Sequence, residues 1–319
     1  MRALAVLLFV LSGLLSQSGH ADEPVGTWRW HQDDRPVKVV FLGGSIGAWP
    51  SGSFAQYLEA ACSKIEIRNL SKTGYGALQL RQRYRAQVLK NPGGKPREGQ
   101  EHWLVHSGGL NSIGSPSITI TETMNAIVAA HRAGAKVVGL SLTPWGKEAE
   151  RRWKEFAGIA SRKKTESSAD YLQGRLNRAE ALGAFVESER RGDPNWLPEE
   201  LPDVAVNLYD SELRDKSAAL RDTEKLGKLW DRNRKLQAQY PDRAAAVVAA
   251  AEIPRWYLRP ELHSFDHIHP NGPGHKLMAT LVCPSMPATW GCNCATIPGL
   301  EWVKGHVAPA PAVATPPSQ

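Results

Sequence analysis

The chain has 319 residues, a formal net charge of +7 and an isoelectric point near 9.2. Hydrophobic residues make up 42% of it and charged residues 22%, which excludes a wholly disordered chain. Four cysteines in this length exclude a disulfide-dense miniprotein, and the basic excess favours an acidic partner without identifying it.

The first 21 residues have the pattern of a secretory signal peptide. Arg2 gives a positive start, residues 3–15 form an apolar run, and small and polar residues follow up to Ala21. The run is shorter than the ~20 residues that a bilayer-spanning helix needs. We therefore expect residues 1–21 to be a signal peptide, the protein to be periplasmic or secreted, and the mature chain not to span a membrane.

Strand and helix patterns alternate along the rest of the chain. Five apolar segments are typical of strands: 37–42, 65–70, 103–105, 137–142 and 204–208. Apolar residues at helical spacing predict helices around Phe54, Leu80 and Met124, and a last helix over about 274–282. This alternation predicts a three-layer α/β/α sandwich around a mainly parallel sheet of about five strands.

The composition changes between residues 146 and 262, where charges of both signs are dense and helical patterns dominate. We interpret this segment as a helical insertion within one domain of residues 22–304. It is either a lid over one end of the sheet or a solvated decoration. Residues 305–319 are rich in proline and alanine, and we expect a disordered tail there.

The four cysteines, Cys62, Cys283, Cys292 and Cys294, allow three disulfide pairings. Cys292 and Cys294 are too close in sequence to be the favoured pair, whereas a bridge from Cys283 to either of them would staple the C-terminal loop. A zinc site is disfavoured because the usual paired C-x-x-C spacing is absent. Free buried cysteines remain an alternative.

Three loops after the predicted strands carry candidate catalytic groups. The first strand runs into Gly43-Gly44-Ser45-Ile46-Gly47, where glycines allow a tight turn and close approach of a substrate. The second runs into a loop ending at Gly74, and the third into Gly108-Gly109-Leu110-Asn111. Backbone N–H groups and an asparagine amide are the donors that an oxyanion hole needs.

A fourth loop precedes the last helix and contains Asp266 and His269. An aspartate three residues from a histidine can orient the imidazole. An imidazole with a pKa of ~6.5 can accept a serine proton near neutral pH. A metal site is the weaker alternative, because no further ligands are evident beside the clustered histidines: His263, His267, His269 and His275.

Together these residues resemble the SGNH, or GDSL-type, serine hydrolases over about residues 37–282, apart from the insertion. Ser45 matches the block of the nucleophile, Gly74 the second block, Asn111 the third, and Asp266-x-x-His269 the last. The resemblance implies the flavodoxin-like SGNH hydrolase fold and a Ser45, His269 and Asp266 triad. It also implies an oxyanion hole formed by the N–H groups of Ser45 and Gly74 and the side chain of Asn111, with no cofactor and no metal.

The sequence departs from the family pattern at two positions. Gly44 precedes the nucleophile where the family usually has aspartate, and Ser112 follows Asn111 where aspartate is frequent. Neither change removes a triad or oxyanion group, but both could alter how the site is braced.

The resemblance implies an exported esterase. No long exposed apolar run suggests a lipid-binding lid, so we expect short acyl groups such as acetyl on a carbohydrate or a small ester. Trp49 and Trp145 could stack on a sugar ring, although packing is the commoner role of such residues. The alternatives are an O-acyltransferase acting on an envelope polysaccharide, a non-catalytic carbohydrate-binding protein and a structural envelope protein.

Residues 68–97 contain many arginines and lysines and no acidic residue. This basic stretch is either a rim beside Gly74 that attracts an anionic saccharide or a solvated helix face. We expect no nucleic-acid partner, and the sequence does not determine the oligomeric state.

Overall fold

The computed structural model describes residues 28–298, except for 51, 96, 113–115, 145–196, 210, 218–221, 233, 252–257 and 265–268. The predicted signal peptide, the predicted tail and the first half of the insertion therefore lie outside the described residues. Within the described part, no helix is long and apolar enough to cross a membrane.

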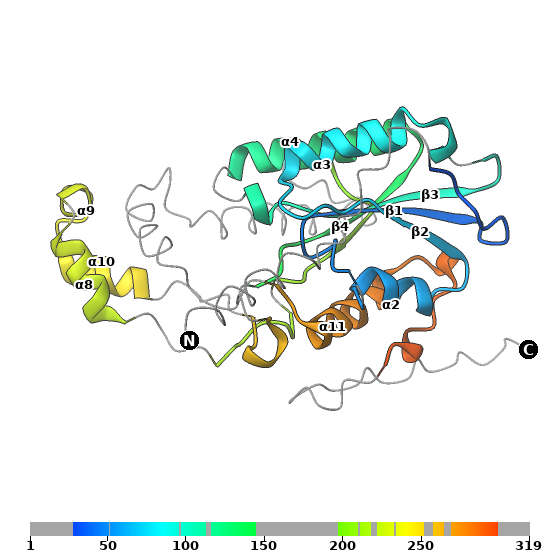
Figure 1. The fold of residues 1–319 in the computed structure, drawn as a ribbon. Helices are drawn as coiled ribbons and strands as arrows, with labels where there is room; N and C mark the ends of the chain where they lie inside the picture. Colours follow the sequence, from blue (N-terminus) through cyan, green and yellow to red (C-terminus); the bar gives the residue numbers. More distant parts are fainter. Residues whose placement is uncertain are drawn as a thin grey trace, which may run out of the picture.

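A five-stranded sheet forms the centre of the domain (Figure 1). Its strands are β1 (Val37–Gly43), β2 (Ile65–Asn69), β3 (Glu101–Ser107), β4 (Lys136–Leu140) and β5 (Val204–Val206). Their order is β2-β1-β3-β4-β5, and every neighbouring pair is parallel. This is the flavodoxin-like order, in which the chain reverses direction across the sheet between β1 and β3. The predicted parallel sheet is confirmed.

Helices cover both faces of the sheet, as its apolar strands require. Figure 1 shows α3 (Ala77–Tyr84) and α4 (Pro116–Arg132) on one face, and α2 (Phe54–Ala61) and α11 (Gly272–Val282) on the other. All seven residues of β1 are buried, and their side chains alternate between two apolar cores. The predicted three-layer sandwich is therefore confirmed.

The polar residue within β1, Lys38, is fully buried and paired. Its Nζ lies 2.6 Å from Oε2 of Glu66 and also donates to the carbonyl oxygen of Gln32. The N–H groups of His31 and Gln32 donate to the same carboxylate. Burial opposes ionisation of Glu66, but these hydrogen bonds lower its pKa overall. The pair fastens the N-terminal segment to β2.

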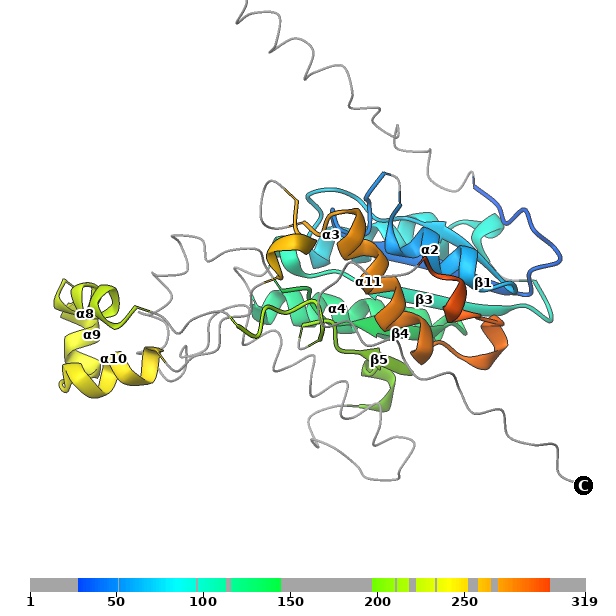
Figure 2. The same ribbon diagram turned by 90° about the horizontal axis from the view of Figure 1, so that it is seen from below.

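Helices follow β5 in the described part of the insertion, as the sequence predicts. This part contains α8 (Thr223–Asp231), α9 (Arg234–Gln239) and α10 (Arg243–Ala251), which lie away from the sheet in both views (Figures 1 and 2). Their buried apolar residues form a separate small core, with Leu226 and Val247 among them. Whether this unit acts as a lid stays a prediction.

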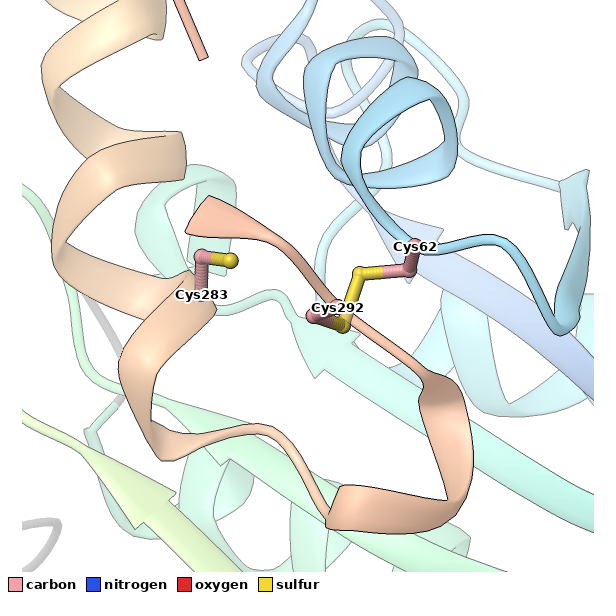
Figure 3. Close-up of side chains that lie close together, drawn as sticks. All are labelled: Cys62, Cys283 and Cys292. Carbon is pink, nitrogen blue, oxygen red and sulfur yellow. A yellow bond between two sulfur atoms is a disulfide. The ribbon is translucent and has the colours of Figure 1, made fainter. Parts of the chain in front are cut away.

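Two disulfides tie the segment after α11 to the domain. Cys62, at the end of α2, is bonded to Cys292, and Cys283 is bonded to Cys294. The Cys283–Cys294 bond is one of the two pairings of Cys283 that the sequence favoured. The described cysteines include no free thiol. Figure 3 shows Cys283 close to the Cys62–Cys292 bond, and the three sulfur atoms lie within 4.8 Å of one another. Because all three sulfurs are in disulfides, they offer no thiolate to a metal.

Candidate active site

The loops that follow β1, β2 and β3 meet at the carboxyl edge of the sheet. The strand order reverses between β1 and β3, and in open α/β sheets ligands bind outside this switch point. After β1 the backbone makes one helical turn, closed by the N–H of Ala48 donating to the oxygen of Gly44 at 3.0 Å. This turn holds Ser45 at the edge, half-buried.

Ser45 and His269 lie in direct contact, although 224 residues separate them. Oγ of Ser45 is 2.6 Å from Nε2 of His269. When the serine hydroxyl donates to Nε2, the neutral imidazole carries its proton on Nδ1. This is the arrangement in which a histidine can remove the serine proton. Asp266 lies outside the described residues, so its role as the third triad member stays a prediction.

The His269 loop is clamped at its base. The N–H of Ser264 donates to the oxygen of His269 at 2.8 Å, and the N–H of Asn271 donates to the oxygen of Leu262 at 2.8 Å. The amide of Asn271 donates to the oxygen of Glu261, while its Oδ1 caps α11 by accepting from Gly274. Asn271 thus fixes both the loop and the following helix. We did not predict this role from the sequence, although an asparagine just before a helix is a known capping signal.

The loop after β2 is bound to the nucleophile turn. Nδ2 of Asn69 donates to the oxygen of Gly47 at 2.8 Å, and the N–H of Lys72 donates to the oxygen of Gly43 at 3.0 Å. Gly74 has a φ of +80°, in the left-handed region that favours glycine. Asn69 is a second residue whose role we did not predict. The signals for it were its position at the end of a strand and its place at the start of the motif Asn69-x-Ser71-x-x-Gly74.

Asn111 lies beside the residue that precedes the nucleophile. A Cβ built on Gly44 would lie 2.9 Å from Nδ2 of Asn111 and 3.5 Å from the oxygen of Tyr75. The same Nδ2 donates to that oxygen at 3.1 Å. Because an amide nitrogen carries two protons, one N–H remains for another acceptor. The three loops therefore converge at Gly44, and Asn111 lies beside this residue, which precedes Ser45. The role of Asn111 as an oxyanion donor stays a prediction.

Ser112 braces two of these loops. Its Oγ accepts the N–H of Ala77, at the start of α3, at 3.1 Å and donates to the oxygen of Gly109 at 3.3 Å. Its own carbonyl oxygen accepts the hydroxyl of Thr119 at 2.7 Å. The serine that departs from the family pattern therefore connects the β2–α3 loop, the β3–α4 loop and α4.

Two buried histidines flank the site. Nδ1 of His106, at the end of β3, accepts the N–H of Gly108 at 3.4 Å, and burial lowers the pKa of His106 to about 4. Burial, with a smaller contribution from the charge of His269, lowers the pKa of His275 to about 4. Both imidazoles are therefore neutral at pH 7.

Of the two tryptophans predicted to contact substrate, only Trp49 lies in the described part of the chain. Its ring lies between His269 and His275, with centroids 6.5 Å and 5.2 Å away. Trp145 is outside the described residues, so its role stays a prediction.

Several residues of the basic stretch bind groups of the protein itself. Arg81 pairs with Glu122, Arg97 lies 2.7 Å from Asp33, and Arg83 donates to the oxygen of Leu70. These contacts weaken the interpretation of the stretch as a rim for an anionic saccharide.

No protein-family model matches the chain, and no curated protein matches its sequence. Among solved structures, it is similar to a GDSL-like lipase from Bacteroides thetaiotaomicron, with 14% identity over 80% of this chain and 89% of the other and a TM-score of 0.44. A lipase/acylhydrolase from Enterococcus faecalis matches at 16% identity over 77% and 92%, with a TM-score of 0.39. The acetyl xylan esterase AlAXEase matches at 12% identity over 78% and 100%, with a TM-score of 0.41. These similarities are distant.

Proposed function

We propose that the protein is a serine esterase of the SGNH type that hydrolyses carboxylic esters. The observation that carries the proposal is the 2.6 Å contact between Ser45 Oγ and His269 Nε2 at the switch point of the sheet. The amide of Asn111 lies beside Gly44, the residue before Ser45, and this supports its proposed role as an oxyanion donor.

In the proposed mechanism, Oγ of Ser45 attacks the ester carbonyl carbon while His269 takes the hydroxyl proton. The tetrahedral oxyanion accepts hydrogen bonds from Asn111 and from the N–H groups of Ser45 and Gly74. His269 then gives its proton to the leaving alcohol. Water then attacks the acyl-enzyme while the same imidazole takes its proton, and the imidazole gives that proton to Oγ of Ser45 as the acid leaves. Asp266 orients the ring throughout.

This proton path orients the substrate. The leaving alcohol must lie on the His269 side, because it receives the proton there, and the carbonyl oxygen points toward the oxyanion donors. The sequence after residue 21 contains no long apolar run that would suggest a lipid-binding lid, which supports short acyl groups, including acetyl, carried by a carbohydrate or a small alcohol.

We also propose that the protein is exported. Two disulfides among the described residues support an oxidising compartment, since disulfides persist mainly outside the cytosol. The signal-peptide pattern of residues 1–21 supports the same location.

The test is a panel of acetyl to long-chain esters and acetylated saccharides, together with a fluorophosphonate that labels activated serines. We expect hydrolysis and labelling by the wild type, and loss of both in Ser45→Ala. Ser63→Ala is the matched control, because Ser63 precedes β2 at the opposite edge of the sheet. Equal activity in Ser45→Ala, or saccharide binding without hydrolysis or labelling, would contradict the proposal. Transfer of the acyl group to an added alcohol in preference to water would indicate the acyltransferase alternative.

A further inference from the structure

An aromatic column leads from the hydrophobic core to His269. Phe54 of α2 packs against Phe41 of β1, with ring centroids 4.9 Å apart. His275 of α11 lies parallel to Phe54 at 6.2 Å and 10°, and Trp49 lies against His275 at 5.2 Å. Trp49 in turn lies 6.5 Å from His269, with the ring planes 31° apart. His269 is thus the outermost ring of the column.

The lower part of this column is rigid and uncharged. Phe41, Phe54 and His275 have no exposed surface. Neither ring nitrogen of His275 has a hydrogen-bond partner within the described part of the chain. An imidazole buried in this way behaves as an aromatic packing group. It gives Trp49 a fixed surface and places no second positive charge beneath His269 when that ring is protonated.

Trp49 belongs to the same loop as the nucleophile, four positions after Ser45. The clamp at Ser264 and Asn271 fixes the backbone of the His269 loop, but it does not fix the orientation of the imidazole. The Trp49 ring, with its centroid 6.5 Å from that of the imidazole and its plane inclined by 31°, limits the space in which the imidazole can rotate. The loop that carries Ser45 therefore also carries Trp49, whose ring lies beside the imidazole of His269.

We propose that Trp49 is a positioning residue that holds the imidazole of His269 in line with Ser45, and that it is not primarily a sugar-stacking residue. This inference rests on the proposed esterase function. A displacement of about 1 Å in a reacting group can cost on the order of 10²-fold in rate. Loss of Trp49 therefore lowers kcat, whereas loss of a sugar-stacking residue raises KM for saccharides alone.

The experiment compares two substrates of different shape. Vinyl acetate has no ring that could stack on Trp49, and an acetylated xylooligosaccharide has several. We expect Trp49→Ala to lower kcat by about 10- to 100-fold on both substrates with little change in KM, in keeping with misplacement of a reacting group. The second-order rate of fluorophosphonate labelling falls in parallel. Trp49→Phe, which keeps a smaller ring at this position, recovers most of the loss.

A further variant controls for the loss of a tryptophan elsewhere in the protein. Trp230→Leu removes a half-buried tryptophan from the separate core of α8 and α10, and we expect no change in kcat or KM.

Two results would overturn the proposal. The first is wild-type kcat in Trp49→Ala, and the second is a rise in KM confined to the saccharide. If instead the wild type hydrolyses no ester and reacts with no fluorophosphonate, the esterase function itself fails and the positioning role fails with it.

Discussion

Gly44 offers a sharp test of the oxyanion hole, because the space beside it is filled by the amide of Asn111. The backbone at Gly44 is not in the left-handed region, so an alanine there is not strained by its dihedral angles. Its Cβ, however, would lie 2.9 Å from Nδ2 of Asn111, well inside van der Waals contact. The next neighbour, the oxygen of Tyr75, lies at an ordinary 3.5 Å. Gly44→Ala therefore displaces Asn111 and little else.

The expected effect on stability differs from the effect on rate. The side chain of Asn111 is exposed and can rotate away, so we expect a change of less than about 0.5 kcal/mol in the free energy of unfolding. Moving the amide removes one oxyanion donor, which typically costs about 10²–10³ in kcat. Gly44→Asp, which introduces the residue that the family usually has, should be at least as inactive because its side chain is larger.

The assay measures kcat and KM on a small ester, with urea unfolding as the stability readout. Gly272→Ala is the matched control, since among the described residues no heavy atom outside its chain neighbours and its own helix lies within 4 Å of the position that its Cβ would take. Asn111→Ala should show the same loss as Gly44→Ala, and the double variant should lose no more, because both changes remove one interaction. A Gly44→Ala protein with wild-type kcat, or losses that multiply in the double variant, would refute the reasoning.

Two predictions concern stability. A disulfide stabilises a protein by lowering the loop-closure entropy of the unfolded chain, and the effect grows with the length of the loop. The sequence separations of 230 for Cys62–Cys292 and 11 for Cys283–Cys294 predict that replacing each pair by alanine lowers the free energy of unfolding by about 5.5 and about 2.8 kcal/mol. Urea unfolding without reductant measures both losses of unfolding free energy, and equal losses for the two pairs would contradict an origin in loop-closure entropy. Burial lowers the pKa of His102 to about 4, below the value of 6.5 that it has in the unfolded chain. As the pH drops, His102 is therefore protonated in the unfolded state first, and the free energy of unfolding falls between about pH 6.5 and pH 4. His102→Phe should remove about 2 kcal/mol of the decline between pH 7 and pH 5, and an unchanged decline would refute the assignment.

The sheet could be predicted from sequence because each strand is either an apolar run or, in β2, an alternation of apolar and polar residues that begins at Ile65. The exception is β3, which extends from Glu101 to Ser107, beyond the predicted 103–105. The prediction was too short because His102 and His106 are polar by type, whereas the structure buries both. Only tertiary packing decides whether a histidine at the end of an apolar run continues the strand.

The site could be predicted in part. The carboxyl ends of parallel strands gather at one edge, so Ser45 and Asn111 could be expected there, and His269 meets Ser45 as the motif order implies. The contacts between loops could not be predicted. The Cys62–Cys292 bond, the bracing by Asn69 and the place of Trp49 depend on which distant segments meet in space. The spacing of residues along the chain does not indicate which distant segments lie together in the fold.

The two departures from the family pattern belong to one local arrangement. Without a side chain at Gly44, the amide of Asn111 can lie against the backbone that precedes Ser45. Ser112, the residue after Asn111, accepts the N–H of Ala77 and donates to the oxygen of Gly109, which anchors the loop that carries Asn111. An aspartate at position 44 would fill the space of the amide. The glycine and the serine therefore preserve the donor near the nucleophile, and neither gives a reason to expect an inactive site.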